Sequence, residues 1–327
     1  LPIEAISQAS ANQRAGRCGR VAPGICFRLY DEQDFLGRAE YTDPEILRTN
    51  LASVILQMNT LRLGDIRNFP FLEAPEARQI NDGYKLLEEL GAVDDKRRVT
   101  KLGRTMARLP LDPRLARMLV MAAEQGSLQE TLVVIAGLSI QDPRERPQEK
   151  QQQADQAHAP FTDKESDFVT LLNLWNAFEE QRQELSGNQL SKWCKRQYLS
   201  WMRMREWRDI HRQLTLICRE QKLAFNKDSA SYEAIHKAIL AGLLGQVALK
   251  LEKREYLATR NRKVLLFPGS KVSKTAPKWV VAAEIVETSR VFARMLARIQ
   301  PEWIDPLATH VVKHHFSEPH WEQKRAQ

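Results

Sequence analysis

The sequence contains few cysteines and no long apolar segment. Its 327 residues include four cysteines, and no two of them form a Cys-x-x-Cys pair. This spacing favours free thiols in a reducing compartment over a disulfide framework or a zinc site. No apolar run approaches the roughly 18 residues that span a bilayer, and no segment resembles a signal peptide. We therefore expect a cytoplasmic protein with no membrane association.

A phosphate-binding loop is also missing. No Gly-x-x-x-x-Gly-Lys-Ser/Thr segment, the loop that cradles nucleotide phosphates in many ATPases, occurs in the sequence. Residues 31–34 (DEQD) look like an acidic magnesium-binding motif, but no phosphate loop precedes them. A solvated loop is the favoured interpretation of this tetrapeptide. The chain by itself is therefore not expected to hydrolyse ATP.

The composition allows several packed domains and favours a polyanionic partner. Hydrophobic residues make up 43% of the 327 positions, and this length is typical of two or three domains. The net charge is +8 and the isoelectric point is about 9.3. This excess favours nucleic acid, although a mildly basic protein without such a partner is an alternative.

A basic octapeptide, residues 13–20 with the sequence QRAGRCGR, is the most specific motif. On a helix, Gln13, Arg17 and Arg20 would share one face because they are spaced i, i+4 and i+7. The two glycines permit close approach of a ligand, and the two arginines suit the terminal phosphate of a nucleotide. The alternative is a solvated basic helix end, since glycine is a poor helix former.

The surroundings of the octapeptide resemble motif VI of the DEAH-box RNA helicases. The resemblance rests on residues 7–30, which read SQASANQRAGRCGR, a Pro-Gly turn and the strand-like ICFRLY. It implies a position on the second RecA-like domain, facing ATP held by the first. Gln13 would order the γ-phosphate and the attacking water, and Arg17 and Arg20 would be arginine fingers.

The same resemblance implies that ATP is bound with Mg²⁺ whose ligands lie outside this chain. Residues 31–34 follow motif VI, whereas the acidic motif of the family precedes it. The sequence opens at Leu1-Pro2 without an initiator Met. We therefore expect a piece of a longer protein, in which residues 1–6 form the return strand of a hairpin before motif VI.

The predicted fold is multidomain and mainly α, with α/β and β parts. The expected units are the tail of the second RecA-like domain (1–43), a winged helix (44–110), a helical-bundle ratchet domain (111–228), an OB-fold barrel (229–316) and the start of a further region (317–327). Phrases such as DPRERP and FPGSKVSK are similar to the bacterial HrpA-type helicases. The motif that spans residues 87–119 is nearly as family-specific as motif VI.

The winged-helix pattern is helix, helix, hairpin. A helix should begin at Asp43-Pro44-Glu45, because these supply a cap, an N1 proline and an acid near the positive dipole end. The expected apolar face of this helix consists of Leu47, Leu51, Val54, Ile55 and Met58. The next helix should end at Gly91, and its expected apolar face consists of Ile80, Tyr84, Leu87 and Leu90. Residues 92–99 should form the hairpin. We expect this module to serve packing more than groove reading.

In the bundle, two helices joined by a short turn are expected, one from 113 to about 125 and one through 132–138, followed by helices at about 168–183 and 191–220, with an exposed loop over 141–159. A helix over 232–244 should lead into the barrel. Short strands at 247–249, 255–258, 264–267 and 279–282, with turns between them, indicate a small closed barrel of four or five strands.

Two basic stretches are candidate RNA sites. Residues 191–220 carry a net charge of +5 interleaved with tryptophans, and residues 246–275 carry +6. Basic residues among aromatics can follow a phosphate backbone and stack bases, but tryptophans at helical spacing more often form core. The candidate RNA contacts are Arg203, Arg205, Lys271 and Lys274, and by resemblance Thr288, Ser289 and Arg290.

The predicted function is that of an ATP-dependent RNA helicase moving 3′ to 5′ on single-stranded RNA, with structured RNA or ribonucleoprotein as a further partner. The alternative is a non-catalytic module that binds single-stranded nucleic acid. His310 and His314 are spaced i, i+4, but no third ligand accompanies them, so we predict surface histidines and no metal site.

Overall fold

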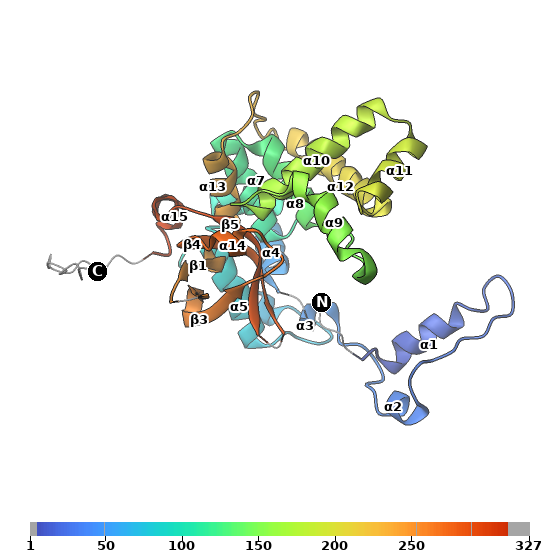
Figure 1. Cartoon of the computed structure of the whole chain (residues 1–327). Coiled ribbons are helices and arrows are strands. Elements are labelled where there is room, and N and C mark those ends of the chain that lie inside the picture. Colours follow the sequence, from blue (N-terminus) through green and yellow to red (C-terminus); the bar gives the residue numbers. More distant parts are fainter. Residues whose placement is uncertain (1–4, 49, 253, 289, 313–327) are drawn as a thin grey trace.

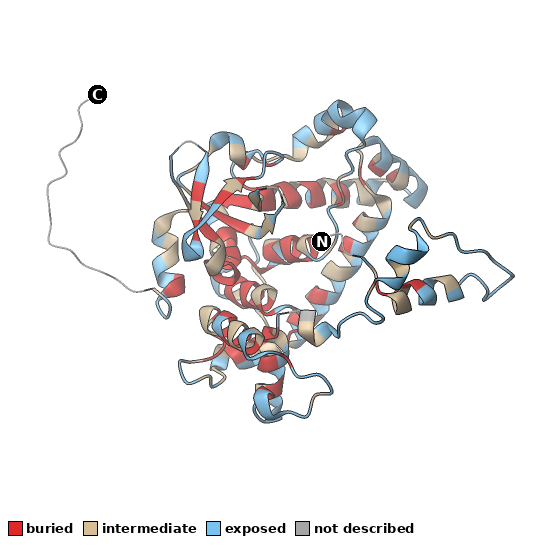
Figure 2. Cartoon of the chain, turned by 90° about the horizontal axis from the view of Figure 1, so that it is seen from below, coloured by how far each residue is buried: buried red, intermediate tan, exposed pale blue. Residues whose placement is uncertain are grey.

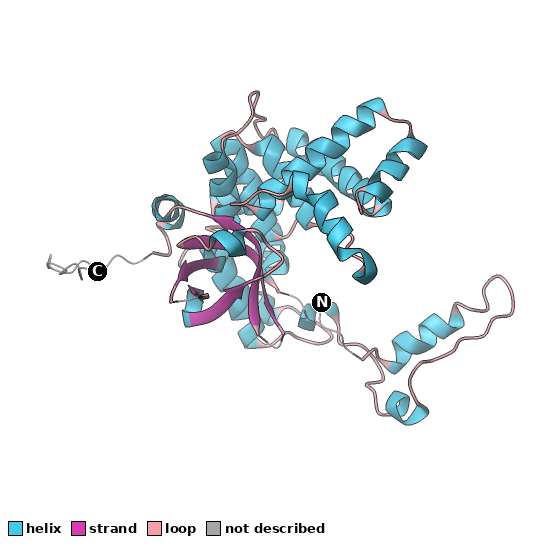
Figure 3. Ribbon diagram, viewed as in Figure 1, coloured by secondary structure: helices cyan, strands magenta, loops and turns pink. Residues whose placement is uncertain are grey.

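The computed structural model describes residues 5–48, 50–252, 254–288 and 290–312. A small β-barrel packs beside a helical body, and the N-terminal segment extends away from both (Figure 1, Figure 3). Within the described residues no helix is both long and apolar enough to cross a membrane.

The N-terminal segment contains two helices, α1 (Gln8–Gly16) and α2 (Glu32–Leu36). The strand predicted over residues 25–30 is not formed, and Ile25, Phe27 and Leu29 are 80%, 83% and 97% exposed. A strand needs neighbours for its backbone N–H and C=O groups, and none of the described residues pairs with this stretch. Most of the hairpin strand predicted over 1–6 lies outside the described residues; Ala5 and Ile6 are not in a strand.

The winged helix consists of α3 (Glu45–Arg48), α4 (Ala52–Leu61), η1 (Ile66–Asn68), α5 (Ala77–Glu89) and α6 (Lys101–Ala107). The single first helix that we predicted is wrong, because α3 and α4 are separate. Leu51, Ile55 and Met58 are buried as expected, whereas Val54 is 36% exposed.

The second half of the winged helix follows the prediction more closely. The apolar residues predicted on α5 are buried, and Gly91 ends the helix with a φ of +69°. The hairpin is reduced to one antiparallel bridge between Val93 and Val99. The prediction missed α6, which begins where the Thr100 hydroxyl accepts a hydrogen bond from Gly103 N at 2.9 Å.

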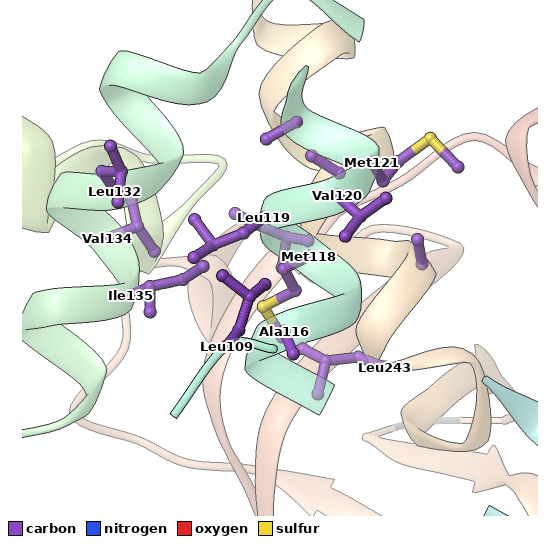
Figure 4. Packing of buried hydrophobic residues seen from close by; sticks show 14 of the residues in the cluster. Leu109, Ala116, Met118, Leu119, Val120, Met121, Leu132, Val134, Ile135 and Leu243 are labelled. Atoms are coloured by element: carbon purple, nitrogen blue, oxygen red, sulfur yellow. The ribbon is translucent and has the colours of Figure 1, made fainter. Parts of the chain in front are cut away.

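The helical bundle contains α7 (Pro113–Gln125), α8 (Leu128–Leu138), η2 (Gln148–Lys150), α9 (Gln151–His158), η3 (Ala159–Phe161), α10 (Asp167–Glu184), α11 (Gly187–Arg196), α12 (Trp201–Glu220) and α13 (Tyr232–Gly242). Leu119 of α7 and Ile135 of α8 lie on the facing sides of their helices in the core (Figure 4). Gly242 of α13 lies so close to α7 that an added Cβ would be 2.4 Å from the Arg114 carbonyl oxygen.

The structure contradicts two predictions about the bundle. The stretch 141–159 is not simply an exposed loop, because it contains α9, in which Ala154 is completely buried. The helix predicted over 191–220 is broken at residues 197–200, where Tyr198 has a φ of +53°. Backbone bonds with residues 143–145 satisfy this break: Ser200 N donates to Pro143 O and Glu145 N donates to Tyr198 O, both at 2.8 Å.

The barrel is closed in the order β1-β2-β3-β5-β4, with only the β3–β5 pair parallel. Its strands are β1 (Val247–Lys250), β2 (Glu255–Ala258), β3 (Arg262–Leu266), β4 (Trp279–Glu287) and β5 (Val291–Arg298); η4 (Leu244–Gln246), η5 (Thr259–Asn261), α14 (Val272–Thr275), η6 (Pro301–Trp303) and α15 (Ile304–Ala308) connect or follow them. The four strands located from the sequence are present, and β5 completes the closure.

The barrel joins the bundle where β5 passes the start of α10. Ser166 forms an antiparallel bridge with Ala297, and Arg298 N donates to Glu165 O at 2.8 Å. Asp167 accepts a hydrogen bond from Leu296 N at 2.8 Å, and burial raises the pKa of this carboxyl. Buried residues continue from the bundle into the barrel (Figure 2), and one hydrophobic cluster includes residues of both units, so the two units share a packed interface.

Candidate functional sites

The motif VI residues lie at the end of α1. Gln13 is on the helix, Arg17 is its C-cap residue and Arg20 lies in the following turn; all three side chains are exposed. The prediction that one helical face carries all three is therefore wrong for Arg20. The helix ends at Gly16, as the low helix propensity of glycine would favour.

The start of α1 is held firmly although its end is open. The Ser7 hydroxyl caps the helix and bonds the Thr42 hydroxyl at 2.8 Å. Gln8 N and Ala9 N donate to the carbonyl oxygens of Ala39 and Glu40, each at 2.9 Å. Residues 38–42 thus fix the helix that presents Gln13 and Arg17.

These residues fit one side of a nucleotide triphosphate site. Within the described residues, neither Arg17 nor Arg20 forms an ion pair with a carboxylate. Their charges are therefore available to an anion. They offer no magnesium ligands, and the described part of the chain has no group of three or more His, Cys, Asp or Glu that could hold a metal. This arrangement can stabilise charge on a terminal phosphate and leaves the cradle to other residues.

The side of the basic helix α12 that faces the bundle makes structural contacts. Trp207 is completely buried and its indole N–H donates to Val133 O at 2.9 Å. Arg203 donates to Asp142 O at 2.9 Å and to Gln141 Oε1 at 2.7 Å, so it ties down the preceding loop. Arg205 is exposed. The tryptophans of α11 and α12 are buried or half-buried, as the core interpretation predicted.

The same loop contains an ion pair that we did not anticipate. The Arg144 guanidinium donates to both Asp142 carboxylate oxygens, with the shortest contact at 2.7 Å. Burial opposes both charges, but the pair lowers the pKa of Asp142 and raises that of Arg144. The DPRERP segment is therefore a fixed part of the bundle.

The barrel brings two predicted RNA residues together in one cavity. Lys274 of α14 and Arg290 of the β4–β5 turn line a cavity of about 710 Å³, and Arg254 and Phe292 line it as well. Sequence reasoning missed Arg254 as an individual contact, although the basic stretch 246–275 contained it, and it missed Phe292 entirely. Neither residue is near Lys274 in the sequence, so only the fold assembles the set.

Three further residues, Lys271, Thr288 and Ser289, were predicted to contact RNA. Lys271 is exposed just before α14. Thr288 N and Oγ1 both donate to Arg290 O, at 2.9 and 3.2 Å, which makes the β4–β5 turn tight. Ser289 lies outside the described residues.

The remaining predicted groups take structural positions. His310 Nε2 bonds Glu89 O at 2.8 Å, while His314 lies outside the described residues. All four cysteines are free: Cys18 and Cys26 are exposed, and burial raises the pKa of Cys194 and Cys218 to about 11.

Three family models match separate parts of the chain between residues 84 and 311. The helicase-associated winged-helix model matches residues 84–111, the ratchet-like helicase-associated model matches 112–171, and the oligonucleotide/oligosaccharide-binding fold model matches 235–311. These matches confirm the winged-helix, ratchet and OB-fold predictions and define the class as a helicase-associated region.

Two curated relatives extend the match to nearly the whole chain. The chain is 54% identical to the ATP-dependent RNA helicase HrpA homolog of Haemophilus influenzae and 54% identical to the ATP-dependent RNA helicase HrpA of Escherichia coli K12, over 99% of its length in each case. It spans 26% and 25% of those proteins, about a quarter of their length. Over nearly its whole length, the chain is therefore similar to a quarter of each of these HrpA-type ATP-dependent RNA helicases.

Proposed function

We propose that the chain is the C-terminal part, from motif VI onward, of a helicase that couples ATP hydrolysis to 3′-to-5′ movement on single-stranded RNA. The observation that carries the proposal is the 54% identity to ATP-dependent RNA helicases along 99% of the chain, which includes the motif VI segment. The exposed, unpaired arginines at the end of α1 support it.

In this proposal the motif VI residues act on ATP that other parts of the protein hold together with Mg²⁺. Gln13 would orient the water and the terminal phosphate, and the charges of Arg17 and Arg20 would stabilise the transferring phosphoryl group. Arginine fingers contribute about 10³–10⁵ in rate in GTPases. The hydrogen bonds that hold the start of α1 support such a role, because the arginines must be in position before negative charge builds up on the transferring phosphoryl group.

The bundle and the barrel would hold the RNA. The exposed cations of the barrel that form no ion pair within the described residues, such as Arg254, Lys274 and Arg290, would supply an electrostatic grip that does not depend on the RNA sequence. Single-stranded RNA, alone or within structured RNA or a ribonucleoprotein, is the partner we propose.

One observation keeps a second candidate open. The sequence has no phosphate loop, so this chain alone has only part of an ATP site. A module that binds single-stranded nucleic acid without hydrolysing ATP would have the same barrel.

Substitution of the two arginines separates these candidates. In the full-length protein, Arg17→Ala combined with Arg20→Ala should lower RNA-stimulated ATP hydrolysis about 10³-fold, in line with other arginine fingers. RNA affinity without nucleotide should stay unchanged. Arg14→Ala is the matched control, because Arg14 is an equally exposed cation within α1. Hydrolysis that survives the double substitution would support the non-catalytic module.

A further inference from the structure

The barrel cavity differs in charge from its neighbours. A cavity of about 1420 Å³ between α5, the barrel and α15 has balanced charges in its walls: Lys85, Arg114, Arg260 and Arg262 against Glu88, Glu89, Glu302 and Asp305. The cavity of about 450 Å³ beside it is also balanced, with Lys278 and Arg298 facing Glu165 and Glu302. The described residues that line the barrel cavity of about 710 Å³ include Arg254, Lys274 and Arg290 and no carboxylate.

Its three cations come from separate segments and lack internal partners. Arg254 lies just before β2, Lys274 on α14 and Arg290 in the β4–β5 turn. No ion pair joins any of them to a carboxylate in the described parts of the chain. Two other barrel cations behave differently.

Those two are neutralised by nearby carboxylates. Arg262 pairs with Glu287 at 2.7 Å, and Lys263 pairs with Glu255 at 3.1 Å. The barrel thus has paired cations at the start of β3 and unpaired cations around the cavity. Three converging, unpaired cations are the recognition chemistry of a phosphate group.

The cavity also has an apolar and aromatic wall. Leu265, Leu266, Pro268 and Phe292 line it. Phe292 meets Phe267 edge to face, with ring centroids 6.4 Å apart, and Arg294 lies over the other ring at 4.6 Å. These contacts fix the Phe292 ring, and a fixed aromatic wall beside cations suits a nucleobase.

We propose that this cavity takes one unstacked nucleotide of the bound RNA strand, with its phosphates on Arg254, Lys274 and Arg290 and its base against Phe292. The inference rests on the proposed RNA-binding function and assigns it a specific pocket. A volume of about 710 Å³ lies in the range of small-molecule sites. A groove that follows only phosphates would need no such depth.

Charge removal at matched positions tests the phosphate half. We would measure binding of labelled oligouridylate to the full chain by fluorescence anisotropy at several salt concentrations. The double variant Arg254→Gln, Lys274→Gln should bind about tenfold more weakly, and its salt slope should fall by about 1.4, since each single-strand phosphate contact contributes about 0.7. The control double variant, Arg262→Gln with Lys263→Gln, removes the same charge but should leave both values nearly unchanged. Equal losses in both double variants would overturn the pocket.

A second variant tests the base half. Phe292→Leu should weaken binding of oligouridylate several-fold but leave binding of an abasic strand of the same length unchanged. Should Phe292→Leu fail to fold, 4-thiouridine crosslinking of the unsubstituted chain replaces it, with the crosslink expected in the peptide that contains Phe292. Equal effects on both strands, or crosslinks that avoid this peptide, would overturn the pocket.

The two proposals can fail separately. Oligouridylate binding that ignores the cavity variants, together with hydrolysis that still needs Arg17 and Arg20, would overturn the pocket and leave the helicase proposal standing. A chain that binds no RNA at any salt concentration would overturn both.

Discussion

Two stretches with a similar strand pattern have opposite fates in this molecule. Residues 25–30 (ICFRLY) and residues 262–266 (RKVLL) both contain closely spaced apolar side chains, one of them β-branched in each stretch. The second forms β3 and pairs with β2 and β5. The first forms no strand, and Phe27 is 83% exposed while Val264 is 2% exposed.

The difference shows that a strand pattern needs a partner strand to become a strand. The barrel supplies hydrogen bonds on both sides of β3, whereas no described residue supplies them to the first stretch. Exposed apolar side chains at alternate positions indicate a surface adapted to burial. We expect the N-terminal segment to gain stability from contacts outside the described residues, and the barrel to depend on its own core.

The largest expected effect is the difference in the free energy of unfolding between alanine substitutions of one leucine in each region. Leu296→Ala should lower the free energy of unfolding by about 2–5 kcal/mol, because this side chain is completely buried in the barrel. Leu29→Ala, at 97% exposure, should change it by less than about 0.5 kcal/mol. Urea denaturation followed by circular dichroism measures both. Similar losses at the two positions would mean that residues 25–30 are packed in solution.

The next effect depends on pH and concerns the joint between bundle and barrel. His236 is fully buried, its Nε2 lies 2.7 Å from the Ser166 hydroxyl, and burial lowers its pKa to about 4. Between the ordinary histidine pKa of about 6.5 and pH 4, the unfolded chain binds a proton that the folded chain does not. Stability should therefore fall by up to about 3 kcal/mol as the pH drops through this window.

Denaturation at pH 7, 5.5 and 4 checks this dependence. His236→Gln should flatten the profile, because it removes the buried imidazole. His310→Gln, at an exposed position, is the control and should keep the slope. An unchanged slope in the His236 variant would assign the pH dependence to other groups.

The smallest expected effect is the difference in stability between alanine substitutions of two helical glycines. Gly242→Ala should destabilise by about 1–3 kcal/mol, since the new Cβ would lie 2.4 Å from the Arg114 carbonyl oxygen of α7. Gly16→Ala meets nothing within 4 Å and should be neutral or slightly favourable to α1. Thermal unfolding of the two variants measures the difference. Equal shifts would contradict close contact between α13 and α7.

Features that depend on neighbouring residues were predictable from the sequence. Asp112 and Pro113 begin α7, and Gly126 follows it with a φ of +65°, as caps and glycine require. The break after α11 was not predictable, because its backbone groups bond Pro143 and Glu145, more than fifty positions away. The closing strand β5 was not located from the sequence, and its pairing with β3, which closes the barrel, likewise depends on the fold.

The candidate sites divide in the same way. Arg17, Arg20, Lys274 and Arg290 could be named from motifs and charge, because their residue type alone suits a phosphate. The role of Arg203 in fixing the 141–142 loop depends on a helix break and on a distant carbonyl, and local charge carries no sign of either. The convergence of Arg254 with Lys274 and Arg290 likewise requires barrel closure.

Strand β5 gives the two halves of the molecule a mechanical connection. Arg290 just before it and Phe292 near its beginning line the cavity, and Leu296 and Arg298 at its end are bonded to the start of α10. Met295, with a φ of +52°, lies between these two ends of the strand. In the proposed complex, β5 would therefore connect the RNA in the cavity directly to the start of α10 in the bundle.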